Sequence, residues 1–77
     1  MGIKVLFFGV LAEVTGTMMK YYQDVKSMKD LMMRIEDDYP EMVHYKFRVS
    51  VNSEITDTGP ELKAGDEVAL MPPFAGG

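Results

Sequence analysis

Cysteine is absent from this sequence of 77 residues. Its absence excludes disulfides, CxxC redox pairs, thiolate metal sites and a cysteine nucleophile. Long apolar runs are also missing, as is the basic and then apolar pattern of a signal peptide, so the sequence predicts no membrane span. We therefore expect a cytoplasmic protein whose chemistry does not depend on a thiol side chain.

Positive charge is scarce, and this restricts the partners. Eight Lys and Arg residues stand against twelve Asp and Glu residues, which gives a net charge of −4. That sign is unfavourable for binding to a nucleic acid or to an anionic membrane, so we predict neither partner. His44 is the single histidine, too few for a metal cluster. We interpret it as a surface or half-buried residue without a catalytic role, and we predict no metal site.

The chain is short, which limits the number of domains. Seventy-seven residues are too few for two cores, so we predict one domain over residues 1–77 with an extended tail at 72–77. Apolar residues make up 47% of the composition. At this size they must be buried efficiently to offset the conformational entropy of the chain.

The first quarter of the sequence predicts a hairpin. Residues 3–8 and 17–25 are rich in β-branched and aromatic residues and predict two strands. The connection at 9–16 is expected to contain a helical turn around 11–14. Alternation in the first strand divides its side chains into an inner set and an unusually apolar outer set: Ile3, Val5 and Phe7 against Lys4, Leu6 and Phe8.

One helix is predicted in the middle of the chain. Ser27 and Asp30 form a capping pattern, and apolar residues then recur at helical spacing until Pro40. These apolar positions are Met28, Leu31, Met32, Ile35 and Tyr39. Their single stripe suits a helix that lies across one face of a sheet, with a short turn at 42–45 after it.

The remaining sequence predicts three more strands. Residues 46–51 alternate, with Phe47, Val49 and Val51 on one face, and a short strand is expected around Ile55. Residues 67–71 form the last strand, with Val68 and Leu70 directed inward. The order predicts an α+β fold in which one main helix covers a sheet of four to five strands.

An acidic run surrounds the end of the predicted helix. It consists of Glu36, Asp37, Asp38 and Glu41. Negative charge there is slightly unfavourable because of the helix macrodipole. We interpret the run mainly as a solvated helix end, with docking against a basic partner and a hard-cation site as alternatives.

An apolar patch is predicted on the outer face of the sheet. If the first and last strands are neighbours, Leu6, Phe8, Ala69 and Met71 add to one apolar area beside Phe74. Exposed patches of this kind usually mark partner surfaces. The alternative is that a loop covers the patch, in which case Phe8 and Met71 should be buried.

The last residues, Met71-Pro72-Pro73-Phe74-Ala75-Gly76-Gly77, are suited to insertion into a channel. Two prolines favour an extended chain without sheet hydrogen bonds, and two glycines lack side chains. From Met71 the chain end reaches about 20 Å at about 3.3–3.6 Å per residue. The reacting group would then be the carboxylate of Gly77.

Both ends of the sequence resemble the MoaD/ThiS family of small sulfur carriers, which includes the small subunit of molybdopterin synthase. The resemblance rests on the opening residues 3–8, on Val51-Asn52-Ser53-Glu54, and above all on residues 65–77 with their Gly-Asp-Glu-Val and Pro-Pro-x-x-Gly-Gly spacing. It implies a ubiquitin-like β-grasp fold with a mixed sheet in which the first and last strands lie side by side.

The resemblance also implies chemistry at Gly77, with Gly76 before it. An E1-like partner would use ATP and magnesium to adenylate the carboxylate, and a sulfur donor would then replace AMP to give a thiocarboxylate. The large subunit of molybdopterin synthase would receive the tail and pass the sulfur to cyclic pyranopterin monophosphate. Leu6, Phe8 and residues Met71, Pro72, Pro73, Phe74 and Ala75 would contact partners. The chain itself would not be catalytic and would hold no permanent cofactor.

Several acceptors stay open at this point. Related carriers serve thiazole synthesis, tRNA thiolation and protein conjugation, while the Gly-Asp-Glu-Val and Pro-Pro elements favour molybdopterin. Phe74 is bulkier than expected before the threaded glycines, which bears on the width of the partner's channel. A different class of function is a β-grasp interaction module with an inert tail.

Overall fold

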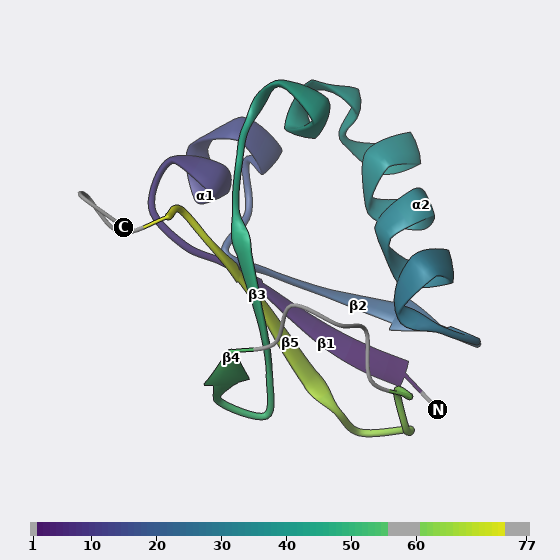
Figure 1. The fold of residues 1–77 in the computed structure, drawn as a ribbon. Helices are drawn as coiled ribbons and strands as arrows, with labels where there is room; N and C mark the ends of the chain where they lie inside the picture. The colour runs from purple at the N-terminus through teal and green to yellow at the C-terminus, as the bar shows by residue number, and fades with distance from the viewer. Residues whose placement is uncertain (1, 56–60, 74–77) are drawn as a thin grey trace.

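Five strands form one mixed sheet in the computed structural model, which describes residues 2–55 and 61–73. The strands are β1 (Gly2–Phe7), β2 (Met19–Gln23), β3 (Arg48–Val51), β4 (Glu54–Ile55) and β5 (Glu67–Met71). Their order across the sheet is β2-β1-β5-β3-β4. The first and last long strands are therefore central neighbours, as Figure 1 shows.

The pairing agrees with the expected topology. β1 and β2 are antiparallel and form the predicted hairpin, with Val5 opposite Lys20. β1 and β5 are parallel, with Leu6 opposite Ala69, and β3 is antiparallel to β5. The parallel pair makes the sheet mixed and places the end of β5 beside the end of β1.

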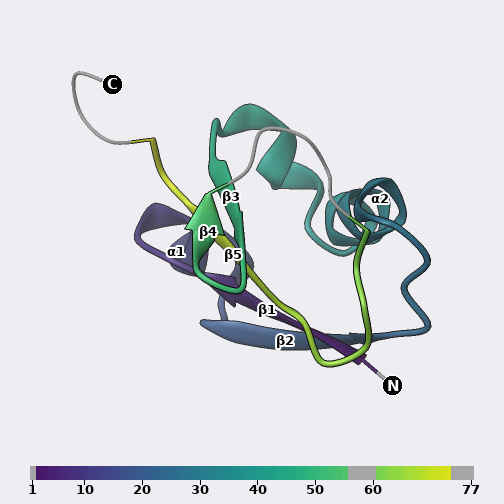
Figure 2. The same cartoon turned by 60° about the horizontal axis from the view of Figure 1, so that its bottom comes forward.

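The main helix α2 (Met28–Asp38) begins and ends where its local signals predict. Ser27 Oγ accepts the N–H of Asp30 at 3.0 Å, which satisfies a free donor of the first turn. Pro40 then starts a 3₁₀ helix, η1 (Pro40–His44). Figure 2 shows that α2 and η1 cover the same face of the sheet.

The connection between β1 and β2 contains more helix than a single turn. Here α1 spans Val10–Thr15 and ends at Gly16, whose φ of 75° is left-handed. The Thr15 hydroxyl donates to the Leu11 carbonyl at 3.0 Å and stabilises this last turn. Leu11 is fully buried and joins the core.

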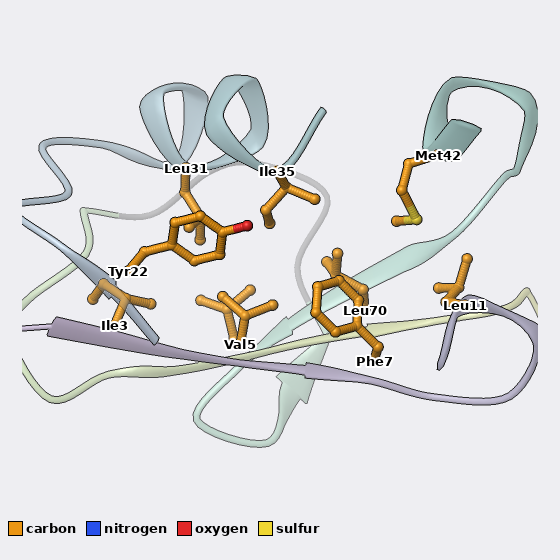
Figure 3. Packing of buried hydrophobic residues seen from close by; sticks show 10 residues of the cluster. Ile3, Val5, Phe7, Leu11, Tyr22, Leu31, Ile35, Met42 and Leu70 are labelled. Atoms are coloured by element: carbon orange, nitrogen blue, oxygen red, sulfur yellow. The ribbon is translucent and has the colours of Figure 1, made fainter. Parts of the chain in front are cut away.

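The core lies between the sheet and the α2 and η1 helices. In Figure 3, Leu31 and Ile35 of α2 point toward the side chains of β1. Ten residues form this buried cluster: Ile3, Val5, Phe7, Leu11, Tyr22, Leu31, Ile35, Met42, Val68 and Leu70. Phe7 also meets Tyr39 edge to face, with ring centroids 5.7 Å apart. The predicted inward residues of both central strands are thus confirmed.

Two strands differ from the predicted ranges. β2 covers only Met19–Gln23 within the predicted 17–25, and Asp24 follows it with a left-handed φ of 56°. β3 begins at Arg48 instead of residue 46. Its Ser50, expected on the polar face, is buried because it lies between Ala69 of β5 and Ile55 of β4.

Within residues 2–55 and 61–73, no helix is long and apolar enough to cross a bilayer.

Candidate functional site

The sheet face opposite α2 carries the candidate site. Because side chains alternate along β1, two adjacent phenylalanines have opposite environments. Phe7 faces the core and is 1% exposed, whereas Phe8, directly after the strand, is 45% exposed. We call the face on the side of Phe8 the open face; it consists of Leu6, Phe8, Met19, Tyr21, Ile55, Ala69 and Met71.

A hollow of about 300 Å³ lies on the open face where β1, β3, β4 and β5 adjoin. It is lined by Leu6, Phe8, Ser50, Ser53, Ile55, Glu67, Ala69 and Met71. The predicted patch residues Leu6, Phe8, Ala69 and Met71 are thus brought together. The alternative of a covering loop, which would bury Phe8 and Met71, is not what the described residues show, because Phe8 is exposed and Met71 is half-buried.

One member of the predicted patch contributes little surface. Ala69 is 7% exposed because it lies in the middle strand of the sheet between Leu6 and Ser50. It forms the base of the hollow, while the longer side chains of Leu6, Phe8 and Met71 form its apolar surface.

The open face is wider than the predicted apolar patch. Met19 and Tyr21 of β2 lie opposite Leu6 and Lys4 and are 41% and 57% exposed. Ile55 extends the face at β4 and is also exposed. Side chains alternate between the two faces along a strand, and this alone places Met19 and Tyr21 opposite the buried Tyr22, because the residue types in 19–23 do not alternate strictly in polarity.

The tail leaves the sheet at the edge of this face. The Phe8 N–H donates to the Leu70 carbonyl at 3.0 Å, which extends the β1–β5 pairing to the last residues of β5. Pro72 is half-buried and Pro73 exposed. Gly9 has a left-handed φ of 58° and lies so close to Pro72 that an added Cβ would be 3.0 Å from Pro72 Cγ. Both views place the end of β5 on the side of the molecule away from α2 (Figure 1, Figure 2).

The remaining predicted site residues are at the end of the chain. Phe74, Ala75, Gly76 and Gly77 lie outside the described residues, so their roles stay predictions. The described part of the tail is Pro72 and Pro73. These two residues follow β5 directly and belong to no helix, strand or turn.

A bracket of hydrogen bonds fixes the start of β5. Asn52 Nδ2 donates to Asp66 Oδ1 at 3.0 Å, and the N–H of Glu67 donates to Asn52 Oδ1 at 3.0 Å. Asp66 Oδ2 also accepts the N–H of Lys63 at 2.7 Å. The Asn52 amide and the Lys63 N–H hold the pKa of Asp66 below its usual range. The Gly-Asp-Glu-Val stretch of the sequence thus has a structural task, because it ties the turn after β3 to the strand that leads to the tail.

Asp38, in the acidic run, has a partner within the chain. Its Oδ2 accepts hydrogen bonds from the Lys20 ammonium at 2.7 Å and from the Tyr22 hydroxyl at 2.8 Å. The Lys20 hydrogen bond lowers the pKa of Asp38, and the same bond raises the pKa of Lys20. Burial, together with Asp38, raises the pKa of Tyr22. We call Lys20, Tyr22 and Asp38 the β2–α2 lock, because they join the edge strand to the end of the helix.

The other acidic residues and the histidine do not converge on a site in the described chain. Glu36, Asp37, Glu41 and His44 are exposed. Among residues 2–55 and 61–73, no group of three or more His, Cys, Asp or Glu side chains could hold a metal ion. Among the described residues, the arrangement therefore offers an exposed apolar face with a hollow and a tail that leaves the sheet beside it, while Asp38 of the acidic run makes a contact within the fold.

Comparison with known proteins agrees with this geometry. The profile of the ThiS family matches residues 5–77. The human molybdopterin synthase sulfur carrier subunit is 30% identical over 83 aligned positions, which cover 97% of this chain and 93% of the human protein.

Solved structures show the same fold. The small archaeal modifier protein 1 of Haloferax volcanii is 26% identical, with a TM-score of 0.81 and complete coverage of both chains. In a complex of subunits 1 and 2 of molybdopterin-converting factor from Helicobacter pylori, the matching chain is 24% identical, with a TM-score of 0.74 and complete coverage of both chains. The fold is the ubiquitin-like β-grasp, and the chain belongs to the ThiS family, the MoaD/ThiS group of sulfur carriers that its two ends resemble.

Proposed function

We propose that this protein is the sulfur carrier subunit of a molybdopterin synthase. The observation that carries the proposal is the position of the tail: β5 runs beside β1, and both end next to an exposed apolar face. A partner that holds this face receives the tail at the same time. The human relative, whose name states this role, supports the choice of pathway.

The proposed chemistry takes place at the carboxylate of Gly77. A carboxylate is a poor acyl donor, so an E1-like enzyme with ATP and magnesium converts it to an acyl adenylate and releases pyrophosphate. A sulfur donor then displaces AMP, and a carbon–sulfur bond replaces the carbon–oxygen bond to give a thiocarboxylate. The large subunit transfers this sulfur to cyclic pyranopterin monophosphate. The carrier supplies the acyl group and the docking face, and its partners supply the catalytic groups.

Docking on the open face would use the apolar side chains around the hollow. Full burial of a large apolar side chain contributes about 1.5–3 kcal/mol. Leu6 and Met71 are half-buried and Phe8 is 45% exposed, so each still has surface to bury against a partner. The carrier has a net charge of −4, which favours partners whose binding pockets are basic. Such pockets also suit the phosphates of ATP and of the pterin precursor.

A second candidate is attachment of the tail to other proteins or transfer of its sulfur to another acceptor. The likeness to an archaeal small modifier protein at 26% identity favours considering a ubiquitin-like modifier. Thiazole synthesis and tRNA thiolation need the same activated tail. These alternative functions share the adenylation of the Gly77 carboxylate with molybdopterin synthesis, and they differ in the protein that receives the activated carrier. A cytoplasmic location remains a prediction from the sequence.

The partner that co-purifies with the chain separates these functions. Affinity purification from the native host, followed by mass spectrometry, should recover the large subunit of molybdopterin synthase together with an E1-like enzyme. A lysine conjugate through residue 77 would instead support the modifier, and recovery of a thiazole synthase would support thiamine synthesis. Removal of Gly77 shortens the reach by about 3.5 Å and should abolish sulfur transfer without unfolding the domain.

A further inference from the structure

The backbone of β2 faces solvent on one side because this strand is an edge of the sheet. The N–H of Phe7 donates to the carbonyl of Met18 at 3.0 Å, which shows which backbone groups point toward β1. In an antiparallel pair these directions alternate, so the backbone groups of Met19, Tyr21 and Gln23 point away from the sheet. A row of outward groups of this kind is a template for a further strand.

Two side chains bind half of the six outward backbone groups, namely both groups of Met19 and the carbonyl of Gln23. The Thr17 hydroxyl donates to the Met19 carbonyl at 2.8 Å and accepts the Met19 N–H at 3.3 Å. Nη1 of Arg34, which extends from α2, donates to the Gln23 carbonyl at 2.6 Å. Of the three outward residues, Tyr21 alone has both its N–H and its carbonyl outside any hydrogen bond with the described chain.

Without these contacts the edge would suit a second copy of the chain. Two β2 strands would pair antiparallel about a two-fold axis, with Tyr21 opposite Tyr21 and Met19 opposite Gln23. Met19 and Tyr21 are exposed, apolar and suited to a strand. The Met19–Gln23 hydrogen bonds of that dimer require the groups that Thr17 and Arg34 occupy. Only the central Tyr21 pair could form, which is too little for a stable interface.

We propose that the Thr17 hydroxyl and the Arg34 guanidinium close the β2 edge against pairing with a second copy of this chain. Arg34 is held in place for this task, because its guanidinium lies 5.5 Å from the centre of the Tyr22 ring and 4.0 Å from the Asp30 carboxylate. The opposite edge, β4, is only two residues long and offers a poor template. The proposal does not depend on the proposed function. Its consequence is that partners bind the open face and the tail instead of extending the sheet at β2.

The test opens the edge with a double variant, Thr17→Val with Arg34→Met. Valine keeps the branched shape of threonine, and methionine keeps the apolar stem of arginine, while both edge contacts are lost. Sedimentation equilibrium should show a shift from the mass of one chain, 8.7 kDa, toward twice that value. The amide protons of Tyr21 and Gln23 should exchange more slowly as the dimer forms.

Matched controls distinguish the edge from other effects. Thr17→Ser keeps the hydroxyl, and Lys29→Met removes one positive charge from an exposed position of α2. Both should remain at the mass of one chain. Adding Tyr21→Pro to the double variant removes an outward N–H, which an edge strand tolerates, and should restore the monomer.

Two outcomes would overturn the proposal. One is a folded double variant that stays monomeric over the concentration range in which the controls are measured. The other is a dimer that survives Tyr21→Pro, because its interface would lie elsewhere. If the double variant does not fold, hydrogen exchange in the unmodified protein tests whether the Thr17 hydroxyl protects the β2 edge. The amide of Met19, bonded to Thr17, should exchange more slowly than that of Tyr21, and equal rates at the two amides would contradict the proposal.

Discussion

Phe7 and Phe8 provide a matched pair for separating folding from docking, since they are neighbours of the same residue type on opposite faces. Phe7→Ala removes a ring that is 1% exposed and packed against Tyr39. Such a substitution costs about 3–5 kcal/mol, a large part of the roughly 5–15 kcal/mol that stabilises a small domain. Phe8 is 45% exposed, so only about half of the 1.5–3 kcal/mol for full burial is at stake. We expect Phe8→Ala to cost about 1 kcal/mol.

Binding to a partner, in contrast to stability, should depend on the exposed Phe8. The exposed half of Phe8 is buried only when a partner docks, so Phe8→Ala should weaken binding to the large subunit or to the E1-like enzyme by about 0.7–1.4 kcal/mol, or roughly three- to tenfold. Urea unfolding followed by circular dichroism measures the loss of stability in each variant, and calorimetric titration measures the loss of partner affinity. A Phe8→Ala protein that loses as much stability as Phe7→Ala, or that binds both partners like the unmodified protein, would refute the division of the sheet into a core face and a docking face.

The β2–α2 lock, the bracket before β5 and the cap of α2 give further predictions for unfolding experiments. Asp38→Asn should lower the free energy of unfolding by up to about 1 kcal/mol because its partners are partly exposed, whereas Asp37→Asn should raise it by about 0.3–1 kcal/mol by relieving the helix macrodipole. The lowered pKa of Asp38 means that the lock contributes fully above the ordinary carboxyl pKa of about 4 and is lost as the pH falls below it. The raised pKa of Lys20 means that the lock contributes fully below the ordinary lysine pKa of about 10.4 and is lost as the pH rises above it. Urea midpoints across this range should therefore converge for Asp38→Asn and the unmodified protein at low pH. Asn52→Gly keeps the left-handed backbone but removes the amide, and should cost about 1–2 kcal/mol; no change in the urea midpoint would show that the bracket is not needed. Ser27→Ala should cost about 1 kcal/mol, and Ser27→Asp should restore most of it by capping the same N–H, so equal losses in both would contradict the capping role.

Local patterns in the sequence predict the elements because each depends on near neighbours. Alternation separates Phe7 from Phe8, and the Ser27 cap and Pro40 set the limits of α2. The same local signals fail where a partner comes from elsewhere in the chain. Asp38 looks like part of a solvated run, and its bond to Lys20 depends on β2 lying beside α2.

Long-range pairing explains the other differences. The parallel contact of β1 with β5 joins residues separated by most of the chain, and it was expected only from the resemblance to a known family. Ser50 alternates as an outward polar residue, but strands on both sides bury it. Met42 was expected in a turn, yet η1 directs it into the core, as Figure 3 shows. The open face was therefore predicted at its centre, whereas Met19, Tyr21 and Ile55 at its margins were missed.

The intact mass of the chain tests the proposed sulfur transfer most directly. The protein would be incubated with its cognate E1-like enzyme, ATP, magnesium and a sulfur donor, and a parallel sample would lack ATP. The account predicts a mass gain equal to the exchange of one oxygen for one sulfur, located at Gly77 by fragmentation and absent without ATP. An unchanged mass with an enzyme that demonstrably activates another carrier would contradict the account and favour an interaction module with an inert tail.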